Sequence, residues 1–383
     1  MGQTWGQTRG ATGNDGPSVH GGNVYKQSRG LGVSIGELMD FSANINPLGP
    51  SPKALQAIGA SLENIVHYPD PDCVELREEL SRHLQVDPDC LVVGNGAVEI
   101  IHLLTNIAKP RTALVLAPTF SEYEVAVKEV GGSVARIPLS KKQDGGGFTL
   151  GLSDIEAHLD CKAIDMIFLC NPNNPTGNIV RRDAVEQLLD ISDERDVTVV
   201  VDESFMDFVD NPEMYSVRQE VSTRRKLAII GSLTKFFALP GLRVGYSITQ
   251  PGVARELRLR QQMWSVNCLA QIAAVASLRD QEYIDFTRAY VEVERAFFMD
   301  GLHDLGKRFG IRAFPSAANF ILLDLEISGM TARKAGEALA ARGILVRDCS
   351  DFPFLNEYHM RIAVRTRAEN ECLLRAVSEV LGR

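Results

Sequence analysis

The chain has 383 residues, of which 45% are apolar and 23% charged, which is typical of a globular protein with a sizeable core and more than one domain. Its 40 Lys and Arg against 49 Asp and Glu give a net charge of −9, with no long basic run. These numbers argue against nucleic acid or an anionic membrane as the main partner. No apolar run reaches the roughly 20 residues that a membrane-spanning helix needs.

The cysteines and the N-terminus indicate the compartment. The seven cysteines are scattered, odd in number and never spaced as Cys-x-x-Cys, which argues against a disulfide framework or a structural zinc site. The histidines form no His-Glu-x-x-His pair, so we expect no metal. No secretory signal is visible. We therefore expect a reducing, cytoplasmic location.

Strand and helix patterns alternate through the first two thirds of the chain. Residues 1–18 are rich in Gly, Thr, Gln and Asn, and we expect a flexible tail there. From about residue 61, short apolar runs alternate with helical periods, as in 122–130 and 182–193. The predicted strands are residues 113–117, 134–138, 164–170, 197–202, 227–231 and 244–249. This alternation predicts an α/β fold whose mostly parallel sheet is covered by helices on both faces.

The pattern changes after residue 250 and predicts a smaller α+β domain. Helical patterns are followed by strand-like runs and a closing helix; the segments are 253–263, 268–280, 283–309 and 331–342 for the helices, and 319–325, 344–347 and 360–364 for the strands. We expect the large domain to span residues 61–265. The small domain would combine residues 19–60 with 266–383.

Four segments carry chemistry-bearing residues: Asn-Pro-Asn-Asn-Pro-Thr-Gly at 171–177, Val-Val-Val-Asp-Glu-Ser-Phe at 199–205, Ser-Leu-Thr-Lys onward at 232–245, and Gly-Asn-Gly-Ala-Val-Glu at 94–99. Alone, each is most simply a turn, a helix cap or a solvated lysine. Three of them lie at carboxyl ends or turns of the parallel-sheet region, where open α/β sheets bind ligands. Together they supply what pyridoxal phosphate needs: a lysine, a carboxylate for the ring nitrogen, phosphate donors and an aromatic face.

In this order, from about residue 19 to the C-terminus, the motifs resemble the aspartate-aminotransferase-like (fold type I) pyridoxal-phosphate enzymes. Two N-terminal segments, His-Gly-Gly-Asn-Val-Tyr at 20–25 and Asp-Phe-Ser-Ala-Asn-Ile-Asn-Pro-Leu-Gly at 40–49, are most similar to the L-threonine-O-3-phosphate decarboxylase branch. The histidinol-phosphate aminotransferase branch is close to it. The resemblance implies a phosphorylated amino acid as substrate and a homodimer with shared active sites.

The resemblance also implies a role for each matching residue. Lys235 is the Schiff-base lysine and proton shuttle, Asp202 pairs with the pyridinium nitrogen, and Asn174 hydrogen-bonds the phenolic oxygen. Phe120 stacks on the ring. The cofactor phosphate is held by Gly96, Ala97, Val98, Ser232, Thr234 and Arg243, and from the neighbouring subunit by Tyr68. The implied substrate-binding residues are His20, Gly21, Asn174, Arg347 and Arg361.

Simpler readings stay open for some of these residues. Arg347 and Arg361 could be surface arginines of a strand pair, and His20 could belong to an ordinary loop. Two positions depart from the family pattern. Phe205 stands where many aminotransferases have Tyr, which removes a donor to the phenolic oxygen. Ala97 can offer the phosphate only its backbone amide.

The resemblance favours decarboxylation of L-threonine O-3-phosphate to 1-amino-2-propanol phosphate and CO2, a step in making the nucleotide loop of cobalamin. The alternative is an aminotransferase acting on histidinol phosphate or a related amino acid. A binding protein without chemistry is a third hypothesis, against which the intact Lys235 and Asp202 argue. Both enzymes share one cofactor apparatus, and the bond that breaks depends on geometry that motifs do not resolve.

Overall fold

The computed structural model of the chain describes residues 21–141 and 146–382. Within these residues the larger sheet has seven strands, and β10 alone runs antiparallel to its neighbours. The expected mostly parallel sheet is therefore confirmed. In spatial order the strands are β2 (Leu91–Gly94), β10 (Gly245–Ile248), β9 (Leu227–Ser232), β8 (Thr198–Asp202), β7 (Met166–Cys170), β3 (Thr112–Ala117) and β4 (Ser133–Pro138).

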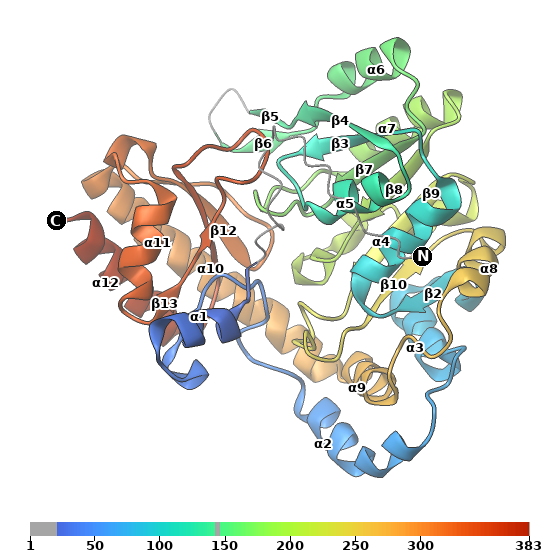
Figure 1. Ribbon diagram of the computed structural model, residues 1–383, viewed down its shortest axis with the longest axis horizontal. Helices are drawn as coiled ribbons and strands as arrows, with labels where there is room; N and C mark the ends of the chain where they lie inside the picture. The colour runs from blue at the N-terminus through green and yellow to red at the C-terminus, as the bar shows by residue number, and fades with distance from the viewer. Residues whose placement is uncertain (1–20, 142–145, 383) are drawn as a thin grey trace, which may run out of the picture.

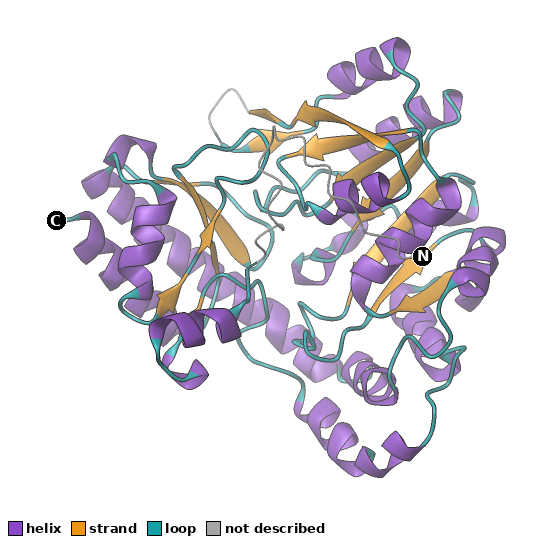
Figure 2. Ribbon diagram, in the orientation of Figure 1, coloured by secondary structure: helices purple, strands orange, loops and turns teal. Residues whose placement is uncertain are grey.

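Helices cover both faces of this sheet (Figure 2). Strand side chains alternate between two cores, so that Ile167 and Leu169 enter one and Met166 and Phe168 the other. On the Met166 side pack α4 (Gly96–Ala108), α5 (Glu122–Glu129) and α8 (Pro251–Arg260). On the opposite side pack α3 (Val74–Leu84), α6 (Leu152–Cys161), α7 (Arg182–Glu194) and α9 (Cys268–Leu278), with α2 (Pro52–Ala60) against α9.

A separate core, in addition to the two on the faces of the larger sheet, surrounds a smaller antiparallel sheet near the C-terminus (Figure 1). Its strands, in order, are β11 (Arg312–Ala313), β12 (Phe320–Asp324), β15 (His359–Ala363) and β14 (Arg347–Asp348). The neighbouring helices are α10 (Gln281–Phe309), α11 (Ala332–Ala340), α12 (Arg367–Leu381) and, from the N-terminal part, α1 (Val24–Leu31). Short pairs join β1 (Met39–Asp40) to β13 (Ile344–Leu345) and β5 (Ser140–Lys141) to β6 (Phe148–Thr149).

Short 3₁₀ helices connect several of these elements: Ile35–Glu37, Leu62–Val66, Pro88–Cys90, Met206–Phe208, Pro212–Met214, Arg218–Ser222 and Glu326–Ser328. The predicted tail 1–18 lies outside the described residues. The proposed domain ranges stay a prediction; α9, which follows residue 265, contributes Ala270 and Ala273 to the core of the larger sheet. No helix in the described part of the chain is long and apolar enough to cross a membrane.

The segment after β1 ties the two sheets together beside Lys235. Asn46 donates its backbone N–H to the carbonyl of Lys235 at 3.0 Å, and its side chain donates to the carbonyl of Phe236 at 2.8 Å. The same amide donates to the hydroxyl of Tyr283 on α10 at 2.7 Å. The chain between the two sheets therefore holds the turn that carries Lys235.

Candidate active site

The predicted site residues come together at the carboxyl ends of β7, β8 and β9. Cys170 is the register partner of Asp202, and Asp202 that of Ile230, so the three parallel strands end at one edge. The loop beginning at Asn171 follows β7, and the turn bearing Lys235 follows β9. This is the edge at which open α/β sheets bind ligands.

Asp202 is 5% exposed, and both of its carboxylate oxygens are held. The hydroxyl of Tyr123 donates to Oδ2 at 2.6 Å, and the backbone N–H of Ser204 donates to Oδ1 at 2.9 Å. Phe120, which the resemblance places over the cofactor ring, meets the Tyr123 ring edge-on at 5.7 Å between centroids. The carboxylate is therefore presented in one orientation, with Phe120 close by.

Lys235 lies within electrostatic reach of three other predicted site residues. Desolvation inside the site, together with the cations of Arg243 and Arg361, lowers the pKa of Lys235 to about 8, against an opposing effect of Asp202. At pH 8 about half of the lysine is then the neutral amine, which is the form that attacks an aldehyde. The chain's own charges thus prepare this lysine for covalent attachment.

The start of α4, the end of β9 and Arg243 form a cradle for an anion. Gly245 is the register partner of both Gly94 and Ser232, so these two segments flank the start of β10. The Ser232 and Thr234 hydroxyls lie 2.7 Å apart. One hydroxyl proton of this pair is left for a ligand, and the first N–H groups of a helix are free for one as well.

Glycines make this cradle possible. Gly96 begins α4 with φ +78°, and a Cβ there would lie 2.4 Å from Nη2 of Arg243. A Cβ on Gly245 would lie 2.5 Å from the backbone nitrogen of Ala97. The arginine and the start of α4 with Gly96, Ala97 and Val98 therefore face one small space, which suits the phosphate of the predicted cofactor.

Arg347 and Arg361 are register partners on β14 and β15, so both side chains lie on the same face of the smaller sheet. They are 7% and 5% exposed, so the reading of surface arginines is wrong. Arg347 donates to both carboxylate oxygens of Asp351, at 2.9 and 2.7 Å.

Arg361 has a different environment. It donates to Oδ1 of Asn174 and, at 2.8 Å, to the carbonyl of Ser42, and its guanidinium lies 5.3 Å from the Phe320 ring centroid. Burial lowers the pKa of Arg361 to about 10, so it remains charged at neutral pH. Its Nε has no hydrogen-bond partner, and within the described residues no carboxylate forms an ion pair with it. A buried cation without a counter-ion is a site for an anionic ligand.

Gly21 and Asn174 lie at this arginine. A Cβ on Gly21 would lie 2.1 Å from the Ser42 carbonyl oxygen, the same oxygen that Arg361 uses. Oδ1 of Asn174 accepts a hydrogen bond from Arg361, which leaves Nδ2 of Asn174 to donate to a ligand. His20 falls outside the described residues.

Tyr68 is not brought to the phosphate cradle of its own chain. It is 77% exposed and stacks on Trp264, with ring centroids 4.1 Å apart. Sequence reasoning also missed two residues. Tyr123 was predicted only as part of a helix, and no pattern distinguishes it from a core tyrosine. Asn44, whose buried Oδ1 has no partner, lies within the 40–49 segment that carried the resemblance.

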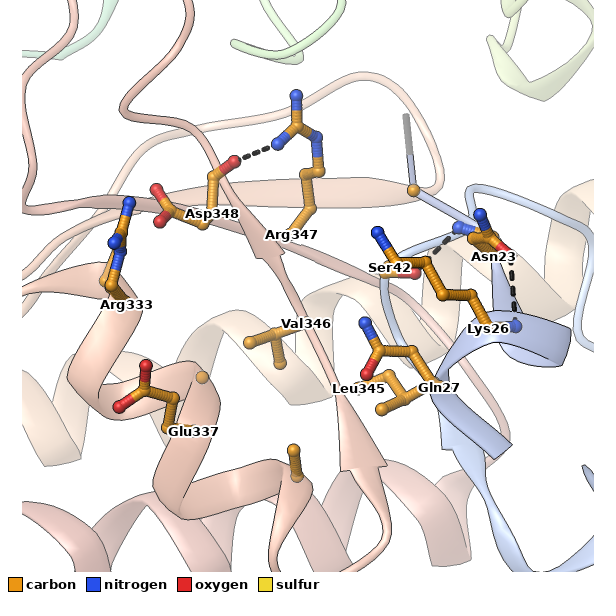
Figure 3. A pocket seen from close by; sticks show the side chains of 15 residues that line it. Asn23, Lys26, Gln27, Ser42, Arg333, Glu337, Leu345, Val346, Arg347 and Asp348 are labelled. Carbon is orange, nitrogen blue, oxygen red and sulfur yellow. Dashed lines mark hydrogen bonds between the residues drawn. The ribbon is translucent and has the colours of Figure 1, made fainter. Parts of the chain in front are cut away.

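A cavity of about 680 Å³ opens beside Arg347, between α1 and α11 (Figure 3). Its lining includes Gly21, Ser42 and Arg347, with Lys26 from α1 and Arg333 from α11. Lys235 and Asp202 do not line it. It therefore adjoins the predicted substrate end of the site rather than the lysine.

Comparison with known proteins now decides the family. The family model described as aminotransferase class I and II matches residues 36–377. This chain belongs to that family. Members of the class I and II aminotransferase family bind pyridoxal phosphate, and the donors at the three strand ends, the Gly96 cradle and the lysine fit this cofactor. The chain is thus a pyridoxal-phosphate-dependent enzyme of the aspartate-aminotransferase-like fold.

This chain is similar to relatives of two kinds, decarboxylases and aminotransferases. It is 35% identical over 366 residues to threonine-phosphate decarboxylase of Salmonella typhimurium, which covers 95% of this chain and 97% of the relative. It is 34% identical over 370 residues to histidinol-phosphate aminotransferase of Moorella thermoacetica, covering 96% and 91%. The crystal structure of histidinol-phosphate aminotransferase from Clostridium acetobutylicum has a TM-score of 0.82 at 32% identity, covering 90% of this chain and 99% of that one.

The lowered pKa of Lys235 predicts how covalent attachment of the cofactor depends on pH. With cofactor-free protein, we expect the attachment rate to rise through a midpoint near pH 8, because the neutral amine forms as pH passes the pKa of about 8. Stopped-flow absorbance measures the rate, and borohydride reduction with peptide mapping identifies the lysine. A midpoint near 10, or a label on Lys226, would contradict the assignment.

The Gly96 cradle predicts a loss of cofactor affinity in Gly96→Ala. The new Cβ would collide with Arg243 and strain a backbone of φ +78°, so we expect the Kd for pyridoxal phosphate to rise about tenfold or more. Gly241→Ala is the matched control, since nothing lies within 4 Å of a Cβ there. Fluorescence titration of the cofactor-free variants gives the Kd. An unchanged Kd in Gly96→Ala would remove this phosphate site.

Proposed function

We propose that this enzyme decarboxylates L-threonine O-3-phosphate to 1-amino-2-propanol phosphate and CO2, as a step toward the nucleotide loop of cobalamin. The observation that carries the proposal is the buried guanidinium of Arg361, which forms no ion pair with a carboxylate of residues 21–141 or 146–382 and lies beside Arg347 on the next strand. Threonine phosphate carries two anions, a carboxylate and a phosphate. Histidinol phosphate carries only its phosphate.

The relatives support the same reaction. Two curated relatives, at 35% and 34% identity, are described as a threonine-phosphate decarboxylase and a putative one. Phe205 supports it as well. Its ring packs edge-on against Phe320 at 5.0 Å, and Phe320 in turn lies against the Arg361 guanidinium. Phe205 therefore supports Arg361 through Phe320, and unlike a tyrosine it offers no hydroxyl to the cofactor.

Each residue has a definite task in this proposal. Pyridoxal phosphate, when bound, supplies an aldehyde for the substrate amine and a ring that withdraws electrons from Cα. Asp202 holds the proton on the ring nitrogen, and the side-chain N–H of Asn174 donates to the phenolic oxygen. Arg243, Ser232 and Thr234 bind the cofactor phosphate, which anchors the ring.

Lys235 and the two arginines act on the substrate. Lys235 would bind the cofactor's aldehyde covalently, and its free amine would deliver a proton at Cα of the substrate. Arg361 and Arg347 bind the substrate's anions, and Asp351 has to share Arg347 with them. If the arginines hold the phosphate, they leave the substrate's carboxylate unbound, and its bond to Cα would be the one that the bound cofactor weakens.

The aminotransferase alternative rests on the histidinol-phosphate aminotransferases among the relatives. It uses the same lysine, aspartate and phosphate cradle. In that reaction Arg361 would bind the phosphate of histidinol phosphate, or the carboxylate of a related amino acid, and a Cα–H bond would break in place of the bond to a carboxylate.

A single incubation distinguishes the two reactions. Holoenzyme is given carboxyl-labelled L-threonine O-3-phosphate with no keto acid present. We expect labelled CO2 over many turnovers, with the cofactor retained in its aldehyde form. Conversion of the cofactor to pyridoxamine phosphate, with turnover sustained by histidinol phosphate and 2-oxoglutarate, would establish the aminotransferase instead.

Two arginine variants test the anion site in the same assay. Arg361→Gln should lower kcat/KM for threonine phosphate by about 100-fold, the scale of a lost buried charge-assisted contact. Arg375→Gln, on a side chain that is 68% exposed, should leave kcat/KM unchanged. Equal activity of the two variants would place the substrate elsewhere.

We also propose that the enzyme is a homodimer with shared active sites. Large apolar side chains are exposed around Tyr68, and we name this surface the Tyr68 patch: Ile65, Val66, Tyr68, Met263 and Trp264. Patches of this kind are typical of surfaces that bind another protein. A second copy covering it would bring Tyr68 to the partner's phosphate cradle, as the resemblance implies.

Sedimentation tests this assembly. We expect a dimer at assay concentration, and we expect Val66→Glu to yield a folded monomer with greatly reduced cofactor affinity, because a charge is placed in the buried interface. Ile327→Glu, at an 85% exposed residue outside the Tyr68 patch, is the control and should remain dimeric. A fully active monomer would exclude the shared site.

A further inference from the structure

A buried tyrosine contacts Asp202 and Phe120, two residues that the family resemblance places at the cofactor ring. Tyr123, in the first turn of α5, is 0% exposed. Its hydroxyl donates to Oδ2 of Asp202 at 2.6 Å. Its ring stacks on Phe168 at 4.9 Å and 8°, and Phe120 meets it edge-on at 5.7 Å and 83°. One side chain therefore touches the predicted partner of the ring nitrogen and the predicted stacking residue.

The protonation states of Tyr123 and Cys170 allow only one direction for the hydrogen bond, from the tyrosine hydroxyl to Asp202. Burial and the nearby Asp202 and Cys170 raise the pKa of Tyr123 well above 10, so the phenol keeps its proton and donates it. Burial, with Asp202 next, raises the pKa of the Cys170 thiol to about 12, so this thiol stays neutral. Asp202 accepts from Ser204 on its other oxygen. Both oxygens of this carboxylate therefore accept a hydrogen bond, which fixes its orientation.

We propose that Tyr123 is a positioning residue for the electron-withdrawing ring: its hydroxyl holds the Asp202 carboxylate in one orientation, so that the carboxylate faces the ring nitrogen and keeps the proton there. The inference rests on the role proposed for Asp202. A carboxylate that loses one of its two donors can turn away from the ring nitrogen and then holds that proton less well. The charge-assisted contact between ring and protein then becomes a weaker neutral one.

The competing explanation is packing alone, with the tyrosine ring filling the space between Phe168 and Phe120. Tyr123→Phe separates the two, because it retains the ring and removes only the hydroxyl. Tyr358→Phe is the matched control. Tyr358 is partly buried and packs against the core of the smaller sheet.

The test measures binding to cofactor-free protein and needs no substrate. The two ligands are pyridoxal phosphate and its 1-deaza analogue, which has carbon in place of the ring nitrogen. We expect Tyr123→Phe to weaken pyridoxal phosphate about tenfold and the analogue by less than about twofold. Combined with Asp202→Asn, the same change should cost no further affinity, because the hydroxyl acts through that carboxylate. Tyr358→Phe should bind both ligands as the unaltered protein does.

The outcomes separate this inference from the proposed function. Unchanged binding of pyridoxal phosphate by Tyr123→Phe, or an equal loss for both ligands, would overturn the positioning role and leave packing. A full additional loss in the Asp202→Asn background would overturn it too. If the unaltered protein does not bind pyridoxal phosphate, the proposed function fails as well.

Discussion

Parallel pairing of β7, β8 and β9 is the constraint on which the rest of this molecule depends. Because Cys170, Asp202 and Ile230 lie in register, the three strands end together, and the residues that follow them meet at one edge. Every residue of these three strands except Thr198 is buried between two helical layers. Polar side chains can thus stand just beyond the core, on a rigid base, where hydrogen bonds to a ligand replace those to water.

Charge balance dominates this edge. Arg243 and Arg361 both lie within electrostatic reach of Lys235, and Asp202 is the acidic group that acts on the pKa of this lysine. Arg361 is buried, Lys235 is half-buried and Arg243 is exposed. Desolvation, together with repulsion from the two arginines, lowers the pKa of Lys235 to about 8. In the proposed function, anionic ligands offset this positive charge: a phosphate at the Gly96 cradle, and a carboxylate or phosphate at the paired arginines.

The smaller sheet contributes through long-range contacts rather than through its own core. Arg361 reaches Asn174 on the loop after β7 and the carbonyl of Ser42, and Phe320 packs against Phe205 just beyond β8. Asn46 then joins this N-terminal segment to the backbone at Lys235. Arg361, Asn174 and, through residues 42–46, the backbone at Lys235 are therefore connected, and a shift of the smaller sheet would reach all three.

From its sequence alone, this protein's α/β fold and the position of Asn174, Asp202 and Lys235 at or just beyond strand ends could be predicted, because apolar periodicity and local motif order are properties of contiguous segments. The roles of these residues follow from the family resemblance and stay predictions. The sequence could not show that Arg347 and Arg361 are buried neighbours, since their strand pairing joins segments 14 residues apart through register. Nor could it distinguish Tyr123 from an ordinary core residue. Its hydrogen bond to Asp202 spans 79 residues and exists only because α5 packs over β7 and β8. Such contacts are decided by tertiary packing, which brings a donor and an acceptor together without any trace in the sequence around either.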